Sequence, residues 1–333
     1  MPARMTVGED KFSAGKKGGA TRRPLILVTG SPRSGTTWVG DVLRQSPGMM
    51  LLTEPFNPDL SQRPWRVCNI RFGEWFVYVT DENAGEFEAP IRRMLELRHD
   101  TLDRLRACRC MKDVIDVSAR AARFGASRFT TRASVMKDPL ALVSSEWLQR
   151  RFGARVIVMI RHPAAIVSSY KRLNLCVDIR GLLRQPLLLR DLLGPMEEEL
   201  REFVMPAQEP DIVDQAAMLW KALHYVIHEF QQRHPDWLFI RHEDLSRDVA
   251  SGFGRICDYA GVKFTQAVKK FAVESNDERL PPELAVQDAF TTRRNAALNL
   301  KNWKNRLTPD EIARVRARVQ DVSRHFYSDE EWE

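Results

Sequence analysis

Apolar residues form short uninterrupted runs that alternate with segments of helical periodicity. The first run, PLILVTG at residues 24–30, ends in a glycine, and residues 34–46 behind it carry apolar side chains every three or four positions. A buried strand, a tight loop and a helix are predicted there, in this order.

The same alternation returns in the middle of the chain. Strands are predicted at residues 135–137 and 156–160, followed by helices at residues 140–151 and from about residue 163 to 171. Another short strand is expected to end at Thr53. Because strands that alternate with helices form parallel sheets, the pattern predicts an α/β fold with a central parallel sheet flanked by helices in three layers.

The C-terminal half contains the longest helical pattern. Residues 211–234 have apolar side chains at every third or fourth position, which predicts an amphipathic helix packed on the core. The run WLFI at residues 237–240 predicts one more buried strand, and residues 309–326 predict a closing helix with a basic outer face.

The domain organisation follows from where these patterns stop. Residues 1–23 are rich in glycine, lysine and arginine without an apolar period, so we expect a flexible basic tail. Residues 24–333 are predicted to form a single domain. Two stretches break its α/β rhythm, at about residues 57–132 and 175–210, and are interpreted as insertions around the scaffold.

The composition indicates the cellular compartment of the protein but does not identify its ligand. The formal net charge of +7 suits an anionic small molecule, a nucleic acid or an acidic membrane surface equally well. The five cysteines form no CxxC pair, which argues against a zinc ribbon or a disulfide framework. No apolar run approaches the roughly 18 residues of a membrane span, and no signal-peptide block begins the chain. We therefore expect a soluble, cytoplasmic protein.

The loop between the first strand and its helix carries the clearest chemistry. In GSPRSGTT, residues 30–37, backbone N–H groups and the positive end of the helix dipole face one point, which predicts an anion site. The spacing is that of a P-loop, and the predicted fold is accordingly P-loop-like. Thr36 replaces the lysine that nucleoside triphosphatases need after the second glycine, and Arg33 supplies a cation instead.

Two other interpretations of this loop stay open on the residues alone. Its glycines would also serve a plain strand-to-helix turn. A P-loop kinase or NTPase would need an acidic residue after a second strand to hold Mg²⁺, and Asp138 is the only comparable residue. The missing lysine favours a metal-free phosphosulfate donor over a nucleoside triphosphate.

Four segments together carry a resemblance to a known family. Residues 29–58 resemble the 5′-phosphosulfate segment of sulfotransferases that use 3′-phosphoadenosine 5′-phosphosulfate (PAPS), particularly the branch that acts on carbohydrates and protein tyrosines, and the chain looks like a soluble bacterial-type member. Residues 135–148, 156–172 and 291–308 resemble further family segments in the same order and spacing. The string RHEDL at residues 241–245 also recurs in the family, and we assign it a structural task.

The resemblance implies a set of donor-binding residues. The loop would bind the 5′-phosphosulfate, a strand-end arginine and a serine eight positions later would bind the 3′-phosphate, and a basic C-terminal loop would close over it. The residues concerned are Arg33, Ser34, Gly35, Thr36, Thr37 and Trp38, then Arg161 and Ser169, then Arg293 and Arg294. In the cytosolic branch of the family this C-terminal loop contains glycine, and the loop of this chain does not have that form. The resemblance therefore does not decide whether Arg293 or Arg294 contacts the 3′-phosphate.

A mechanism follows from the same resemblance. Glu54 stands where the carbohydrate and tyrosine branches carry their proposed general base, and would take the proton of the acceptor hydroxyl. Arg33 and Lys137 would stabilise the negative charge that develops on the departing adenosine 3′,5′-bisphosphate. Another branch uses histidine as base, but His99 and His162 stand in no matching string and rank below Glu54.

No metal is expected. His224 and His228 lie four positions apart on the long helix, but no third ligand and no HExxH glutamate accompanies them.

The acceptor is expected to be a hydroxyl, on a carbohydrate or a glycolipid, and the insertions are expected to select it. The first insertion contains a cluster of aromatic residues that would suit sugar rings, namely Trp65, Trp75, Phe76 and Tyr78, although packing in the core is the commoner explanation for such residues. The leucine-rich residues 181–193 are interpreted as ordinary packing, with a lid or a lipid-facing surface as alternatives. A basic nucleic-acid-binding protein using Arg123, Arg128 and Arg132 is the remaining alternative; because it leaves the donor-like segments unexplained, no nucleic-acid partner is predicted.

Overall fold

The computed structural model describes residues 23–61, 70, 72–98, 101–106, 108–175, 178–205, 210–276 and 300–333. Arg293 and Arg294 of the expected C-terminal donor loop lie outside the described residues, as do residues 1–22 of the expected basic tail.

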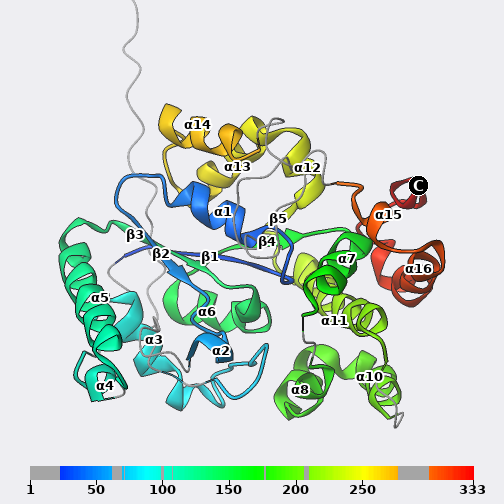
Figure 1. The fold of residues 1–333 in the computed structure, drawn as a ribbon, viewed down its shortest axis with the longest axis horizontal. Helices are drawn as coiled ribbons and strands as arrows, with labels where there is room; N and C mark the ends of the chain where they lie inside the picture. The colour runs from blue at the N-terminus through cyan, green and yellow to red at the C-terminus, as the bar shows by residue number, and fades with distance from the viewer. Residues whose placement is uncertain are drawn as a thin grey trace, which may run out of the picture.

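A five-stranded parallel sheet forms the centre of the molecule (Figure 1). Its strand order is β2-β3-β1-β4-β5, and each neighbouring pair is parallel. The strands are β1 (Leu25–Gly30), β2 (Met49–Thr53), β3 (Ala133–Lys137), β4 (Arg155–Ile160) and β5 (Leu238–Arg241). The predicted α/β fold with a central parallel sheet is therefore confirmed.

Both faces of the sheet are buried, each in its own hydrophobic core. Along β1, Leu25 and Leu27 belong to one core, whereas Ile26 and Val28 belong to the other. Because neither face of the central strand meets water, its sequence is uniformly apolar and does not alternate. The sheet is the middle one of the three predicted layers, and each core lies between the sheet and a layer of helices.

Helices cover each face (Figure 1). One layer consists of α1 (Thr36–Leu43), α13 (Val249–Ala260) and α14 (Gln266–Glu274), with α12 (His242–Arg247) beside them. The other layer contains α6 (Ser145–Phe152), α7 (Pro163–Leu173), α11 (Ile212–Arg233) and α16 (Pro309–Ser323). The C-terminal segment also contains α15 (Trp303–Arg306) and the 3₁₀ turn η6 (Asp329–Trp332).

The helix predicted at residues 140–151 has a different form at its start. A 3₁₀ helix, η2 (Pro139–Ser144), precedes α6. The Asp138 side chain accepts a hydrogen bond from the Leu140 amide, and Pro139 occupies the first position, so this start is fixed by a cap. The helices α7, α11 and α16 agree with prediction; α16 begins with a capping box between Thr308 and Glu311.

The two predicted insertions are largely helical. The first contains α2 (Pro58–Ser61), η1 (Ala84–Glu86), α3 (Glu88–Leu95), α4 (Thr101–Arg106) and α5 (Met111–Thr130). The second contains α8 (Ile179–Leu183), α9 (Pro186–Leu188), the π-helix η3 (Leu189–Leu193), η4 (Gly194–Met196) and α10 (Glu197–Val204).

The insertions pack on each other and on the main core. Arg184 of the second donates to both carboxylate oxygens of Glu74 in the first, at 2.8 and 2.6 Å. Most of the leucines of residues 181–193, among them Leu188 and Leu192, are buried in the core that also contains α11. Ordinary packing of that segment is therefore confirmed.

Candidate active site

The predicted site residues gather at the carboxyl ends of the strands. Arg33 follows β1, Glu54 follows β2, Lys137 ends β3 and Arg161 follows β4. From β1 the chain runs to β2 and then to β3, both on one side of β1, and from β3 it crosses to β4 on the other side, so the direction of the strand order reverses at β1. In open α/β sheets, ligands bind outside the carboxyl ends of the strands at such a reversal.

The loop after β1 has a backbone that requires its glycines. Gly30 has φ +133°, and a Cβ there would lie 2.2 Å from the carbonyl oxygen of Met159. Gly35, at the start of α1, has φ +102°, and a Cβ there would lie 2.7 Å from Nδ1 of His242. Arg33 itself has φ +72°, in the left-handed region. The loop is thus a tight, specifically folded connection.

Three residues far apart in the sequence meet at this loop. Nε of Arg33 donates to Oγ of Ser169 over 3.0 Å, and Nη1 of Arg161 donates to the carbonyl oxygen of Arg33 over 2.8 Å. The Arg161 carbonyl in turn accepts from the Trp220 indole at 2.9 Å, which ties the end of β4 to α11. Arg33, Arg161 and Ser169, expected to share the donor, therefore lie together.

The electrostatics of this cluster favour an anion. Burial and the neighbouring Arg161 lower the pKa of Arg33 to about 10, and burial lowers the pKa of Arg161. At neutral pH both guanidiniums still carry their charge. Two partly buried cations beside each other repel, and a bound phosphate or sulfate would relieve that repulsion.

Buried hydroxyls at the loop have no hydrogen-bond partner among the described residues. They are Oγ1 of Thr29, Oγ of Ser31 and Oγ of Ser34. Buried polar atoms are nearly always paired, so each unpaired one needs an explanation. The oxygens of a bound phosphosulfate would supply acceptors, and the residues present therefore fit such a group.

The remaining loop residues differ in their surroundings. Thr36 is buried and Thr37 half-buried at the start of α1. The Trp38 indole lies in the core against Phe253, and its N–H donates to Oγ of Ser275 over 2.7 Å. The single hydrogen-bond donor of the Trp38 side chain is thus engaged inside the core, where it anchors α1, and a contact of Trp38 with PAPS stays a prediction.

Glu54 and Lys137 form the second part of the site. Nζ of Lys137 lies 2.5 Å from Oε1 of Glu54, and their side chains are 4% and 25% exposed, respectively. The other carboxylate oxygen, Oε2, accepts from Nδ2 of Asn57 at 2.8 Å. The Glu54 charge also acts on Arg33, which places the ion pair within electrostatic range of the loop. Asn57 was missed in the sequence, although it lies only three positions beyond Glu54.

Glycine on α1 lets the helix approach this pair. A Cβ on Gly40 would lie 3.1 Å from both Cβ and Cγ of Lys137. The stem of the lysine therefore runs directly against the helix backbone, which fixes the direction of its ammonium group.

Asp138 has a structural position. It is completely buried, with Oδ2 accepting from the Phe56 amide at 2.6 Å and Oδ1 accepting from the Leu140 amide at 2.9 Å. Burial and the nearby Glu54 raise its pKa to about 7, against the effect of these two amides. Asp138 thus fixes the turn that carries Glu54, and both of its oxygens are engaged by the backbone.

The RHEDL segment joins the C-terminus to the end of β4. Glu243 is buried and accepts from the His162 amide and from the Tyr327 hydroxyl, both at 3.0 Å. Arg241 pairs with Glu331 and lies 4.5 Å from the centre of the Tyr327 ring. The predicted structural task of this string is confirmed.

Residues 24–180 match the model of the sulfotransferase family. The match spans a little under half of the chain. The matched region contains β1 to β4 and, with them, Arg33, Glu54, Lys137, Arg161 and Ser169. The predicted recognition of a sulfotransferase enzyme is therefore confirmed.

Solved sulfotransferase structures resemble this sulfotransferase at low sequence identity. A sulfotransferase domain of the olefin synthase of Synechococcus PCC 7002 is 16% identical, with 92% of this chain and 98% of that chain covered and a TM-score of 0.43. A mouse sulfotransferase in complex with PAP is 14% identical, with 94% and 88% covered and a TM-score of 0.43. A sulfotransferase of Mycobacterium avium is 14% identical, with 92% and 78% covered and a TM-score of 0.41. No curated protein matches the chain.

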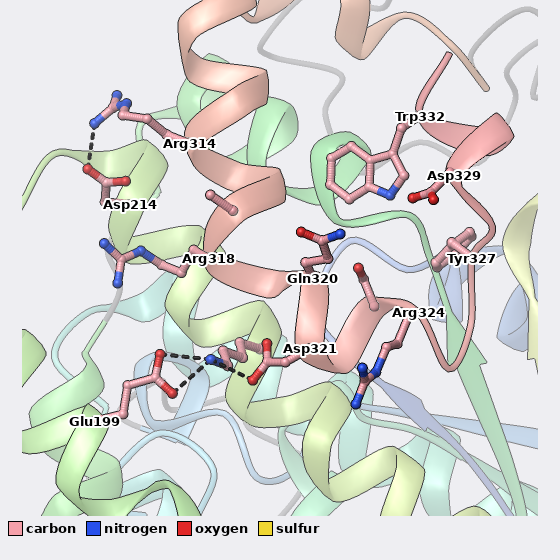
Figure 2. Close-up of a pocket in the computed structure, with 13 residues that line it drawn as sticks. Glu199, Asp214, Arg314, Arg318, Gln320, Asp321, Arg324, Tyr327, Asp329 and Trp332 are labelled. Carbon is pink, nitrogen blue, oxygen red and sulfur yellow. Dashed lines mark hydrogen bonds and ion pairs between the residues drawn. The ribbon is translucent and has the colours of Figure 1, made fainter.

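A cavity of about 950 Å³ lies beside α16 (Figure 2). It is lined by residues of α10, α11, α16 and the C-terminal segment, and none of the predicted site residues is among them. Its charges are largely paired: Arg314 with Asp214 at 2.5 Å, and Lys221 with Glu199 and Asp321 at 2.8 and 2.9 Å. The cavity therefore offers few charges for a ligand.

The histidines singled out in the sequence have packing roles where they are described. His224 stacks on Trp220, and His228 stacks on His325. His162 is buried between aromatic rings, and His99 lies outside the described residues. Within the described part of the chain, no group of three His, Cys, Asp or Glu side chains could hold a metal ion. None of the described helices is long and apolar enough to cross a membrane.

Proposed function

We propose that this sulfotransferase moves a sulfuryl group from PAPS to a hydroxyl of a carbohydrate or glycolipid acceptor. The observation that carries the donor assignment is the meeting of Arg33, Arg161 and Ser169 at the carboxyl ends of β1 and β4. PAPS carries anionic groups on the 3′ and 5′ oxygens of its ribose, and this cluster offers two guanidiniums and a hydroxyl at one place.

We assign the two anionic groups of PAPS to different residues of this cluster. Arg161 and Ser169 serve the 3′-phosphate, while the loop with Arg33, Ser34, Gly35, Thr36 and Thr37 surrounds the 5′-phosphosulfate. Arg293 and Arg294, outside the described residues, are assigned to closing over the 3′-phosphate. The hydrogen bond from Arg33 to Ser169 joins the residues assigned to the 5′-phosphosulfate to those assigned to the 3′-phosphate.

The transfer needs little covalent work from the protein. A bond forms between the acceptor oxygen and sulfur while the bond from sulfur to the phosphate oxygen breaks, and adenosine 3′,5′-bisphosphate leaves. Glu54 accepts the proton of the acceptor hydroxyl, which prevents a positive charge on the attacking oxygen. Arg33 and Lys137 stabilise the negative charge that develops on the departing phosphate. In this scheme no metal is required.

Two observations speak against nucleoside triphosphate turnover. Thr36 occupies the position of the P-loop lysine. Both oxygens of Asp138, the only candidate for a Mg²⁺ carboxylate, already accept from backbone amides. A kinase or NTPase would therefore lack its P-loop lysine and its metal ligand.

Of the aromatic cluster predicted in the first insertion, only Trp75 among the described members supports a carbohydrate acceptor. Phe76 and Tyr78 are buried in the core, and Tyr78 bonds to Asp191. Trp75 is half-buried at the edge of the same core, which leaves part of its ring for contact with a sugar face. Trp65 lies outside the described residues. We also place the protein in the cytoplasm, in keeping with the free thiols of Cys108, Cys110 and Cys257.

The donor assignment is tested by calorimetric titration with adenosine 3′,5′-bisphosphate in the absence of metal. Binding is expected in the wild type and is expected to be lost in Arg161→Ala. Arg150→Ala is the matched control, because Arg150 is an exposed arginine paired with Asp81 at 3.6 Å. Preferential binding of Mg²⁺-ATP, or bisphosphate binding unaffected by Arg161→Ala, would refute the assignment.

A further inference from the structure

Helix α5 has two apolar faces, and only one of them is packed. The inner face buries Val117 and Phe124 against the domain. In Figure 1 the helix lies along the edge of the molecule, beside α3 and α4. A surface helix of a globular protein normally carries polar residues on the side away from the core. On α5 this side is apolar instead.

The outer face bears large hydrophobic side chains in water. Met111 is 73% exposed, Ile115 is 62% exposed and Phe129 is 91% exposed. Exposed alanines continue the same stripe between them, at positions 119, 122 and 126. At 100° per residue these six positions fall within a sector of about 80°, roughly opposite Val117 and Phe124. No charged side chain lies inside this sector.

One border of the stripe is basic. Exposed Lys112 and Arg123 lie directly beside it, whereas exposed Arg128 lies next to Val117 on the inner side. The two acidic residues of α5, Asp113 and Asp116, are only half-exposed and lie farther from the stripe than Lys112 and Arg123. An apolar stripe bordered by cations is the pattern of a helix that lies flat in the interface of an anionic membrane.

Charge argues against two other occupants of this face. A second copy packed antiparallel through the same stripe would set the basic border with Lys112 and Arg123 against its own copy, and these like charges repel. Residues 1–22 would also bring like charge, because their sequence has five Lys and Arg against two acidic residues. Arg23, where the described chain begins, donates to the carbonyls of Arg128 and Thr131, so this basic segment joins the molecule at the Phe129 end of α5.

From this placement we propose that α5 docks the protein onto an anionic lipid surface. The helix would lie parallel to the membrane, with Met111, Ile115 and Phe129 inserted at the level of the headgroups and Lys112 and Arg123 on the lipid phosphates. Its 20 residues span about 30 Å, long enough for three separated anchors. The inference does not rest on the proposed donor or acceptor.

The test is flotation of the full-length protein with vesicles of phosphatidylcholine alone and with 30 mol% phosphatidylglycerol. Binding is expected only to the anionic vesicles and is expected to weaken as salt rises. The double variant Ile115→Glu, Phe129→Glu should lower the bound fraction at least tenfold. Val273→Glu, at an exposed apolar position on α14, is the matched control and should bind like the wild type. Circular dichroism melting of each variant verifies that it is folded.

Several outcomes would overturn the proposal. Absence of flotation at low salt would do so, as would equal flotation of the wild type and the double variant. A dimer in light scattering that the double variant dissociates would assign the face to a second copy. Binding of a DNA duplex that survives the double variant but is lost in Lys112→Gln, Arg123→Gln would assign the basic border to nucleic acid.

Discussion

At the residue scale, Glu54 has a backbone conformation that residues other than glycine rarely adopt. Its φ of +47° lies in the left-handed region, and its two carboxylate oxygens are directed by Lys137 and Asn57. Such backbone strain persists only where the surroundings impose it, and it is concentrated at functional sites. The surroundings here are the Asp138 turn and the buried Lys137 stem.

Replacing Glu54 tests its role as the base. Glu54→Gln preserves the shape and the bond to Asn57 but removes the proton acceptor, so sulfuryl transfer from radiolabelled PAPS is expected to fall by about 10²- to 10⁴-fold. Affinity for adenosine 3′,5′-bisphosphate should stay within about threefold of the wild type. Glu82→Gln, at an exposed glutamate paired with Arg190, should leave both quantities unchanged. Full turnover in Glu54→Gln would remove Glu54 from the mechanism.

The adjacent serines of α7 offer a matched pair for the phosphate site. Oγ of Ser169 meets Arg33, whereas Oγ of Ser168 donates to the carbonyl of Ala165 within the helix. Ser169→Ala is expected to weaken bisphosphate binding about tenfold in calorimetry, because it removes a hydrogen bond to a charged ligand. Ser168→Ala should bind as the wild type does. Equal effects of the two substitutions would contradict the assignment of Ser169.

At the scale of elements, the connection between β2 and β3 depends on one buried carboxylate. Asp138 holds the turn after β2 through the Phe56 amide and starts η2 through the Leu140 amide. Because Phe56 is 82 positions away from Asp138, this link was not visible in the local sequence. Asp138 thereby acts as a positioning residue for Glu54.

Removing this carboxylate should affect stability and turnover together. Asp138→Ala leaves two buried amides without an acceptor, at a cost of about 1–3 kcal/mol each in the free energy of unfolding. We expect urea unfolding to show the loss, and kcat to fall with bisphosphate affinity largely kept. Asp178→Ala removes the cap of α8, where Asp178 accepts from the Gly181 amide, and should cost stability without lowering kcat. A kcat unchanged in Asp138→Ala would show that the turn does not position Glu54.

The elements that could be predicted from the sequence are those whose apolar pattern fits only one kind of secondary structure. Strands such as β1 and β4 are buried on both faces, so their apolar runs located them to within two residues. Helix α5 was missed because apolar residues occur on two opposite faces, so no single polar face marks the helix. The meeting of Arg33, Arg161 and Ser169 was anticipated from the family resemblance, since no local pattern links residues 136 positions apart. The pairing of Glu54 with Lys137 across neighbouring strands became apparent only in three dimensions.

At the scale of the whole molecule, buried histidines join distant parts of the chain. His162, directly after β4, stacks on Trp303 and contacts Tyr327 and Trp332 of the C-terminal segment. His224 stacks on Trp220 of α11 and meets Phe326. Burial lowers the pKa of each imidazole to about 3, with nearby Arg241 adding to the effect on His162. Both rings are therefore neutral in the folded protein at physiological pH.

This neutrality predicts how stability depends on pH. A histidine whose pKa is lower in the folded state than in the unfolded state stabilises the fold above its unfolded pKa, and this contribution declines as pH falls toward the folded pKa. With an unfolded pKa of about 6.5 and a folded pKa of about 3, the decline extends over the window between these values. At pH 5, each of the two histidines should have lowered the free energy of unfolding by about 2 kcal/mol relative to neutral pH.

The variant His224→Phe isolates one of these contributions. Phenylalanine retains the stacking on Trp220 but cannot take up a proton, although it loses the hydrogen bond from the ring to the Trp220 carbonyl. The variant is therefore expected to be less stable than the wild type at pH 7, but to lose about 2 kcal/mol less on transfer to pH 5. Urea unfolding at pH 5, 6 and 7 measures both differences. Parallel pH profiles for the two proteins would mean that His224 titrates alike in the folded and unfolded states, which its complete burial argues against.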